Sequence, residues 1–486
     1  MNKKLLLGVG SVVMALALGL AACAGSTPDA SLPGRVTYGN DVGVHDPSIF
    51  KDDDGTYYAF GTHYAVASSK DLITWTQVAG DYHPEVLYAE DGTTKTLKSF
   101  AYSGKTWPEA LKETVELVAP KNKDKDTISS TWAPDVIKIG RKYYMYYSIT
   151  QEFGSKKSAI GRVEADKVTG PYGNNQVIIS TPGTGCPNAI DPTVFYDKDG
   201  KLWMVYGSDA MGIYLIELNA DGDKVGLPTD ESQQLIDQGG YGEQLWQGGG
   251  NNVEGPYIFY NAETKYYYLM TSYGSLSSDY NMRVARSKKV TGPYEDISGN
   301  DMASSVDKTF GNKLAGNYQF EGDTTWAALG HNSVLVEDGK YLVVCHVRDR
   351  VDGGHHLEVR QLFFNEDGWP VLSPNRYGGE TIGKVSKSDV AGDYELILHT
   401  SGTSAEYAHS KLYTFESSGK ITQGGTEVGT WKLGKGYYIT IELDGKTYKG
   451  VVAPTWIKYQ SKAGYAITAT LDDGNALWAN PAAATR

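Results

Sequence analysis

Short apolar runs separated by turns recur along most of the chain. Five segments carry an acidic residue or a histidine near their start, continue into a short apolar strand, turn, and end in a second strand. They are HDPSIFKDDDGTYYAFGT from His45, APDVIKIGRKYYMYYS from Ala133, IDPTVFYDKDGKLWMVYGS from Ile190, VEGPYIFYNAETKYYYLMTS from Val253 and GHNSVLVEDGKYLVVCHV from Gly330. Turns such as Asp338-Gly339 between two apolar runs are typical of β-hairpins. Each segment is therefore expected to begin a unit of antiparallel strands.

Further strands follow the first two in these units, for example at residues 158–164 and 281–287. Four strands in each of five units predict a five-bladed β-propeller. A blade cannot bury both of its faces alone, so the units are expected to close into a ring. The composition agrees with an all-β fold, because 35 Tyr favour strands and 57 Gly favour turns.

The repeat ends after Leu372, and the propeller is expected to span residues 35–374. Its first interval is the longest, which predicts an inserted loop on a face of the ring between about Gly80 and Asp126. Residues 375–486 have short strands broken by Gly pairs, and they predict a separate small β-barrel. The tryptophans spread along this segment are expected to lie in its core: Trp431, Trp456 and Trp478.

Residues 1–22 have the features of a secretory signal peptide. Lys3 and Lys4 precede an apolar run that is a little short for a membrane span. The run ends in Leu20-Ala21-Ala22-Cys23, which resembles the lipobox of bacterial lipoproteins and implies a lipid on the sulfur of Cys23. An ordinary secretory signal with a chance cysteine is the alternative. Residues 23–34 are expected to form a flexible tether, and the protein to be an extracytoplasmic, cell-surface lipoprotein that contacts the membrane through its lipid anchor only.

The net charge of −13, without a stripe of Lys and Arg, argues against nucleic acid as a partner. We expect a monomer. With Cys23 lipidated, only Cys186 and Cys345 could pair, and both lie in apolar segments. Buried free thiols and a disulfide between blades both remain open.

Polar residues stand just before each predicted innermost strand. In a propeller these strands line the central channel, so residues at their starts converge at one end of it. Four carboxyl groups that converge on one point raise each other's pKa, which points to function or to a bound cation. The alternative is that each residue only caps a strand or forms an Asx-turn. The five residues are Asp46, Asp135, Asp191, Glu254 and His331.

Five motifs in chain order carry a family resemblance. They are Val44-His45-Asp46-Pro47-Ser48, Trp132-Ala133-Pro134-Asp135, Ile190-Asp191-Pro192, Val253-Glu254-Gly255-Pro256-Tyr257 and Gly330-His331-Asn332-Ser333. Together they resemble glycoside hydrolase family 43 across the whole propeller.

The resemblance implies an inverting mechanism. Asp46 would be the general base, Glu254 the general acid, and Asp191 would raise the pKa of Glu254 and orient it. A neighbouring carboxylate does keep a Glu protonated near neutral pH, as an acid requires. Asp135 is expected to be structural or to lie beside the substrate. His331 resembles a channel histidine that holds a hydrated calcium ion in the family's arabinanases; a plain core histidine is the alternative.

The chain looks most like the two-domain bacterial endo-1,5-α-L-arabinanases. Gly330-His331-Asn332-Ser333, Asn188-Ala189-Ile190-Asp191 and the barrel after the propeller carry this likeness. It implies arabinan, the side chain of pectin, as substrate, with Asn188 and Ser208 as hydrogen-bond partners. Trp132 would be either a stacking platform for a sugar ring or a tryptophan of the propeller core.

Two other functions stay open. An exo-acting α-L-arabinofuranosidase or β-xylosidase of the same family would need a cavity closed on one side. A lipoprotein that binds glycans without cleaving them would be expected to lack at least one of Asp46, Asp191 and Glu254, and all three are present.

Overall fold

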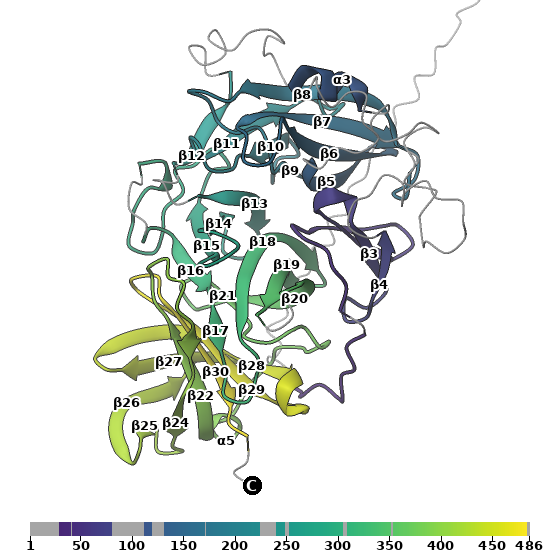
Figure 1. The fold of residues 1–486 in the computed structure, drawn as a ribbon. Helices are drawn as coiled ribbons and strands as arrows, with labels where there is room; N and C mark the ends of the chain where they lie inside the picture. The colour runs from purple at the N-terminus through teal and green to yellow at the C-terminus, as the bar shows by residue number, and fades with distance from the viewer. Residues whose placement is uncertain are drawn as a thin grey trace, which may run out of the picture.

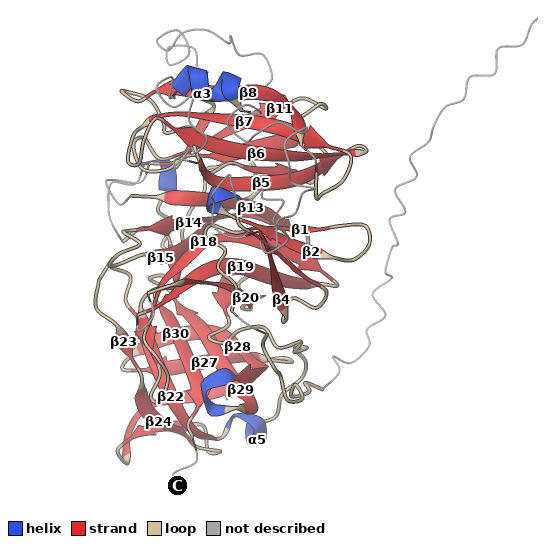
Figure 2. Cartoon of the chain, turned by 45° about the vertical axis from the view of Figure 1, so that its right-hand side comes forward, coloured by secondary structure: helices blue, strands red, loops and turns tan. Residues whose placement is uncertain are grey.

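The computed structural model describes residues 29–39, 41–79, 111–118, 131–170, 172–223, 240–247, 252–304, 309–350 and 353–483. Strands dominate these residues, and the helices are few and short (Figure 2). The predicted signal peptide, Cys23 and the first part of the tether lie outside the described residues. Across the ranges given above, no helix has the length and apolar character that a membrane crossing requires.

Five sheets form the first part of the fold, and four of them consist of four consecutive strands. Blade 1 contains β1 (Ser48–Lys51), β2 (Tyr57–Phe60), β3 (Val66–Ser69) and β4 (Trp75–Ala79). Blade 2 contains β5 (Thr131–Ile139), β6 (Lys142–Thr150), β7 (Lys157–Ala165) and β8 (Gly173–Pro182). Blade 3 contains β9 (Thr193–Tyr196), β10 (Leu202–Tyr206), β11 (Ile213–Leu218) and β12 (Glu243–Trp246). Blade 4 contains β13 (Glu254–Asn261), β14 (Tyr266–Tyr273), β15 (Asn281–Ser287) and β16 (Asn312–Ala315).

Blade 5 is larger than predicted. Its strands are β17 (Tyr318–Gln319), β18 (Trp326–Glu337), β19 (Lys340–Asp349), β20 (His355–Phe364) and β21 (Pro370–Leu372), joined by β23 (Ala408–His409) from the C-terminal part. β23 pairs in parallel with β17 and so extends the sheet toward the barrel. The sequence repeat shows only the four strands that this blade shares with the others.

The five sheets form a closed ring. The innermost strands touch in the order β1, β5, β9, β13 and β18, and β18 returns to β1. Figure 1 shows the blades together with the barrel that follows them. The predicted five-bladed propeller is therefore confirmed. No described strand is exchanged between the first and last blades, so side chains and loops join them. Ser333 Oγ donates to the carbonyl of Pro47 (2.8 Å) and accepts from the N–H of Ile49 (3.0 Å).

Part of the predicted insertion folds as a helix rather than a loop. α3 (Lys112–Val118) packs against β6, β7 and β8 of blade 2. Its apolar residues Leu111, Val115 and Val118 recur with helical spacing and are buried in the blade core. Residues 80–110 and 119–130 lie outside the described residues.

The C-terminal part is a closed eight-stranded barrel, as predicted, with the short helix α5 (Lys387–Val390) before it. Its strands are β22 (Gly392–His399), β24 (Lys411–Phe415), β25 (Lys420–Gln423), β26 (Thr426–Leu433), β27 (Tyr438–Leu443), β28 (Lys446–Ile457), β29 (Lys462–Leu471) and β30 (Ala476–Pro481). All three predicted core tryptophans are buried, but Trp478 packs with residues of blades 4 and 5. The barrel therefore shares a core with the propeller.

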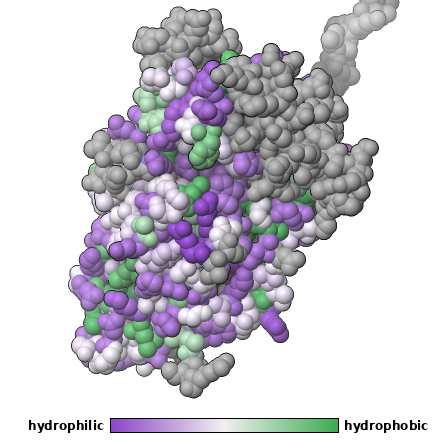
Figure 3. All heavy atoms as spheres, viewed as in Figure 1, coloured by the Kyte–Doolittle hydropathy of each residue, from purple (hydrophilic) through white to green (hydrophobic). Residues whose placement is uncertain are grey.

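Polar contacts reinforce that junction. The side chains of Asn375 and Asn480 exchange two hydrogen bonds, and Thr468 Oγ1 donates to the carbonyl of Leu372. On the face shown in Figure 3 the described side chains are mostly hydrophilic, most strongly near the centre. Cys186 and Cys345 are both buried free thiols.

Candidate active site

A cavity of about 640 Å³ opens at one end of the propeller channel. Residues from all five blades and the loops that follow their strands line it. The predicted acids and base, Asp46, Asp191 and Glu254, all line this cavity, together with His331. Each of the four is at least partly buried, and Asp46, Asp191 and His331 are between 5% and 8% exposed. The cavity therefore brings together three carboxyl groups that lie far apart in the sequence.

The backbone is irregular where these side chains enter the cavity. Asp46, Asp191 and His331 have φ values of 53°, 56° and 44°, in the left-handed region that non-glycine residues rarely adopt. The pairing of β13 with β14 shifts register after Glu254, and the pairing of β18 with β19 shifts on both sides of Gly330. Bulges re-aim side chains, and strained backbone gathers at functional sites. Here both features turn the side chains toward the channel mouth.

Asp46 is surrounded by hydrogen-bond donors. Thr62 Oγ1 donates to its Oδ2 at 2.5 Å. His45 Nδ1 lies 3.1 Å from Oδ2, and His331 Nδ1 lies 3.1 Å from Oδ1. Burial alone would raise the pKa of Asp46, but His331 and His45 outweigh burial and hold this pKa well below its usual range. Asp46 is therefore ionised at neutral pH and can accept a proton.

Asp191 and Glu254 form the protonated part of the site. Burial raises the pKa of Asp191 to about 7, and Glu254 and Asp46 add to the rise while His331 opposes it. Burial also raises the pKa of Glu254, against the opposing effect of His331. Tyr280 donates its hydroxyl to Glu254 Oε1 at 2.6 Å, and Ser208 Oγ donates to Oε2 at 3.2 Å. Burial therefore favours the protonated form of both carboxyl groups, and a general acid must hold a proton before it can donate it.

His331 is the positive group of the site. Burial would lower its pKa, but Asp46 and Asp191 raise it to about 10. Its ring lies over Gly255, where a Cβ atom would approach the His331 ring to 2.9 Å. Glycine at position 255, with φ of 59°, therefore leaves the room that the imidazole occupies beside Glu254.

Asp135 does not line the cavity, although it stands at the start of a blade. Ser48 Oγ and the N–H of Val194 donate to its carboxyl group, which joins blades 1, 2 and 3. Burial raises its pKa to about 6. These contacts are structural.

The predicted substrate-binding residues all line the cavity. Asn188 is 2% exposed and accepts a hydrogen bond from Ser158 Oγ, while Ser208 contacts Glu254. Trp132 is half-buried, and its Nε1 donates to Thr150 Oγ1 at 2.9 Å. Its ring packs edge-on against Phe153, which is 86% exposed at the cavity. Trp132 thus presents ring surface to the cavity instead of lying wholly in the core.

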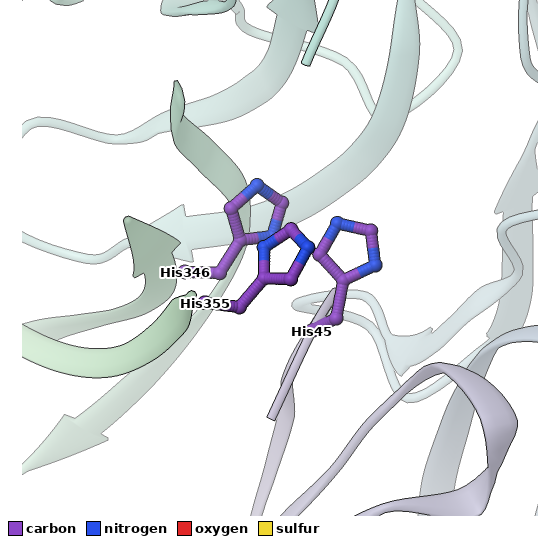
Figure 4. A group of neighbouring side chains, drawn as sticks. All are labelled: His45, His346 and His355. Atoms are coloured by element: carbon purple, nitrogen blue, oxygen red, sulfur yellow. The ribbon is translucent and has the colours of Figure 1, made fainter. Parts of the chain in front are cut away.

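Three histidines lie together behind Asp46. Figure 4 shows His346 and His355 approaching from the strands of blade 5 and His45 from the segment before β1. Their ligand atoms lie within 4.8 Å of one another, close enough for one metal ion. However, Arg348 donates to His355, and the N–H of Asp46 donates to His346 Nδ1 at 3.2 Å. His346 Nδ1 and the His355 ring therefore already accept hydrogen bonds, while His45 Nε2 and His346 Nε2 are buried without a partner among the described residues. His45 and His346 both contact Asp46, which ties the cluster to that carboxylate.

The channel below the cavity offers a different cation environment. His331 and Asn332 line a space of about 20 Å³ there, roughly one water molecule in size. Asn332 Oδ1 is buried and has no hydrogen-bond partner. A free carboxamide oxygen in a space that the buried carboxyl groups of Asp46 and Asp191 also line fits a hard cation such as calcium.

Several site residues escape the sequence motifs. Thr62 follows β2 and Tyr280 precedes β15, and no sequence motif marks either residue. Arg348 and His355 stand where β19 ends and β20 begins. Only His346 has a signal, because it is a polar residue inside the apolar run Leu342-Val343-Val344-Cys345 and Val347.

Comparison with family models matches residues 105–370 to glycosyl hydrolases family 43 and residues 374–479 to a C-terminal lipocalin-like domain. The extracellular endo-α-(1→5)-L-arabinanase 2 of Bacillus subtilis is 37% identical, over 90% of this chain and 92% of that protein. The crystal structure of endo-1,5-α-L-arabinanase from Thermotoga petrophila is 35% identical, with a TM-score of 0.79, and the match covers 92% of this chain and all of that one. The extracellular exo-α-(1→5)-L-arabinofuranosidase of Cellvibrio japonicus is 30% identical over 68% of this chain and 86% of that protein.

Proposed function

Because the chain belongs to glycosyl hydrolases family 43, we propose that it hydrolyses internal α-1,5-L-arabinofuranosidic bonds of arabinan with inversion. The observation that carries the proposal is the convergence of one ionised and two raised-pKa carboxyl groups on an open cavity. Endo-arabinanases match this chain over nine-tenths of its length. The wider function, glycoside hydrolysis, follows from the family itself.

Asp46 acts as general base. In an inverting hydrolysis this carboxylate takes a proton from a water molecule, whose oxygen attacks the anomeric carbon from the face opposite the leaving group. The histidines and Thr62 around Asp46 keep it ionised and aimed at the cavity.

Glu254 acts as general acid on the opposite side of the scissile bond. It donates its proton to the glycosidic oxygen as the carbon–oxygen bond breaks, and the products are a new reducing end and an alcohol. Asp191 raises the pKa of Glu254 by its negative charge and accepts a hydrogen bond from the N–H of Gly255. After proton donation, Tyr280 and Ser208 stabilise the Glu254 carboxylate with hydrogen bonds.

Calcium is part of the proposal. His331 and Asn332 are the residues that would hold the hydrated ion, Asn332 through its unpartnered Oδ1 and His331 after loss of the proton that it otherwise carries. The bound ion supplies positive charge that offsets the three carboxyl groups. Removal of calcium with a chelator is expected to lower activity, and calcium readdition to restore it.

Endo action fits a cavity that draws its lining from every blade, since a polymer must pass across the channel mouth. The exo alternative has one specific support, the likeness to the exo-acting enzyme of Cellvibrio japonicus, which covers a smaller share of this chain. The proposed location is outside the cytoplasm, in line with the extracellular relatives. We also propose that a lipid on Cys23 anchors the protein to the membrane and that the protein is a monomer.

The test is digestion of debranched linear arabinan by the chain without residues 1–22, with products resolved over time. A ladder of oligosaccharides and a fast fall in viscosity are expected. Arabinose alone from the first time point would contradict endo action. Absence of any product from arabinan, with activity on xylan or galactan, would contradict the substrate.

A further inference from the structure

We propose that His346 positions the general base Asp46 through its Nδ1 atom, and that its ring also fixes Tyr280, the hydrogen-bond partner of the general acid. The inference rests on the proposed roles of Asp46 and Glu254. It makes His346 a positioning residue, since it does not line the cavity that receives the substrate.

The first support is the hydrogen bond between His346 and the backbone of the base. His346 is fully buried, and its Nδ1 accepts the N–H of Asp46 at 3.2 Å. Asp46 has a left-handed φ of 53°, a conformation that non-glycine residues rarely adopt and that persists only where its surroundings hold it. His346 Nδ1 therefore gives the backbone N–H of Asp46 a hydrogen-bond acceptor in this left-handed conformation.

The second support is the path from the base to the acid. The rings of His346 and Tyr280 stack with centroids 5.7 Å apart and an interplanar angle of 25°. Tyr280 donates its hydroxyl to Glu254 Oε1 at 2.6 Å. One aromatic pair therefore contacts the backbone N–H of the proposed base and the carboxyl group of the proposed acid.

The third support is the space made for that pair. Gly330 is the cross-strand partner of His346, and a Cβ atom at Gly330 would approach the Tyr280 ring to 2.5 Å. The ring of His45 also packs against His346, with centroids 4.4 Å apart. His346 thus contacts both rings, and its Nδ1 lies near Asp46 alone, 3.2 Å from its N–H and 3.4 Å from its Oδ1.

Inversion depends on the placement of two groups on opposite faces of the sugar, and an error of about 1 Å can cost about a hundredfold in rate. Loss of the His346 acceptor is therefore expected to lower kcat and to leave KM nearly unchanged. A residue with a merely structural role would lower the unfolding temperature and leave kcat per folded molecule unchanged.

Three substitutions of His346 vary the hydrogen-bond acceptor at this position. His346→Asn places an amide oxygen where Nδ1 lies, His346→Gln places its polar atoms one bond further, and His346→Leu has no acceptor. All three lose the aromatic ring. On linear arabinan we expect kcat to fall about a hundredfold in His346→Leu and His346→Gln, with KM within about twofold, and His346→Asn to recover about tenfold of the loss. Thermal unfolding and circular dichroism establish how much of each protein is folded.

Tyr280→Phe supplies the second measurement, because it keeps the stacked ring and removes only the hydroxyl. We expect this variant to have a lower kcat and an unchanged KM. The measurement remains available if a His346 variant does not fold. Equal kcat values in the folded Asn and Gln variants, or a wild-type kcat in His346→Leu, would overturn the proposal.

Asp46→Asn separates this inference from the function on which it rests. If Asp46→Asn retains wild-type activity, the assigned base is wrong and the proposed function fails. If Asp46→Asn is inactive while the Asn and Gln variants at position 346 behave alike, only the positioning inference fails.

Discussion

The centre of the propeller and the interior of the barrel are both enclosed by antiparallel strands, yet they are filled differently. The barrel interior is apolar, with Phe415, Ile421 and Ile441 fully buried. The mouth of the propeller channel instead buries carboxyl groups and histidines. Buried charge is costly unless it is paired, whereas buried apolar area stabilises a fold. The difference indicates that the propeller centre is kept for chemistry and the barrel interior for stability.

The comparison is tested most strongly by removal of the proposed acid. Glu254→Gln keeps the size of this side chain and one of its two acceptor oxygens but cannot donate a proton to the leaving group as an acid does. Since a general acid contributes about 10²–10⁴ in rate, kcat on linear arabinan is expected to fall about a thousandfold. The matched control is Glu243→Gln, at the start of β12 and exposed, which should keep full activity. Substantial activity in Glu254→Gln would contradict the assignment.

A substitution inside the barrel should lower stability and leave catalysis unchanged. Trp431 is 3% exposed within the barrel core, and Trp431→Ala leaves a large cavity there. Loss of about 3–5 kcal/mol of stability is expected from such a truncation. We expect a lower unfolding temperature with kcat per folded molecule near the wild-type value. A fall in kcat of the folded variant would mean that the barrel interior also serves catalysis.

The pH dependence sharpens the chemistry of the propeller centre. Activity should fall as the pH rises past the raised pKa of Glu254, because the general acid then loses its proton. The fall is at most tenfold for each pH unit. On the acid side activity should persist below the usual carboxyl range, since the pKa of Asp46 is well below it. Asp191→Asn removes the neighbouring negative charge, so in kcat/KM against pH its alkaline limb should move to lower pH. An unmoved limb would contradict the role of Asp191.

The smallest expected effect concerns the cavity wall. If Trp132 stacks on a sugar ring, Trp132→Ala should raise KM about fivefold, which corresponds to the roughly 1 kcal/mol of one aromatic contact. Trp203→Ala, at a half-buried tryptophan of blade 3 that does not line the cavity, is the control. Equal effects of the two substitutions on stability, with KM unchanged in both, would assign Trp132 to the propeller core.

The repeat could be recognised from sequence because each blade needs the same alternation of apolar strand and turn. The carboxyl groups could be found for a related reason, since position at the start of an innermost strand fixes position at the channel mouth. Thr62 and Tyr280 could not be found from the sequence, because they reach the site from loops beside second and third strands. No repeat constrains the identity of residues in these loops. Helix α3 was missed as well, since its helical spacing of Leu111, Val115 and Val118 lies in a segment dominated by charge.

Among the described residues the ring closes without a shared strand, and this has a consequence for the order in which the enzyme is made. Asp46 lies in the first blade to leave the ribosome, while His331 and His346, which contact it, belong to the last. A nascent chain that stops after blade 4 already holds all three carboxyl groups but lacks both of these partners. Catalytic competence therefore arises late in synthesis, when blade 5 docks against blade 1.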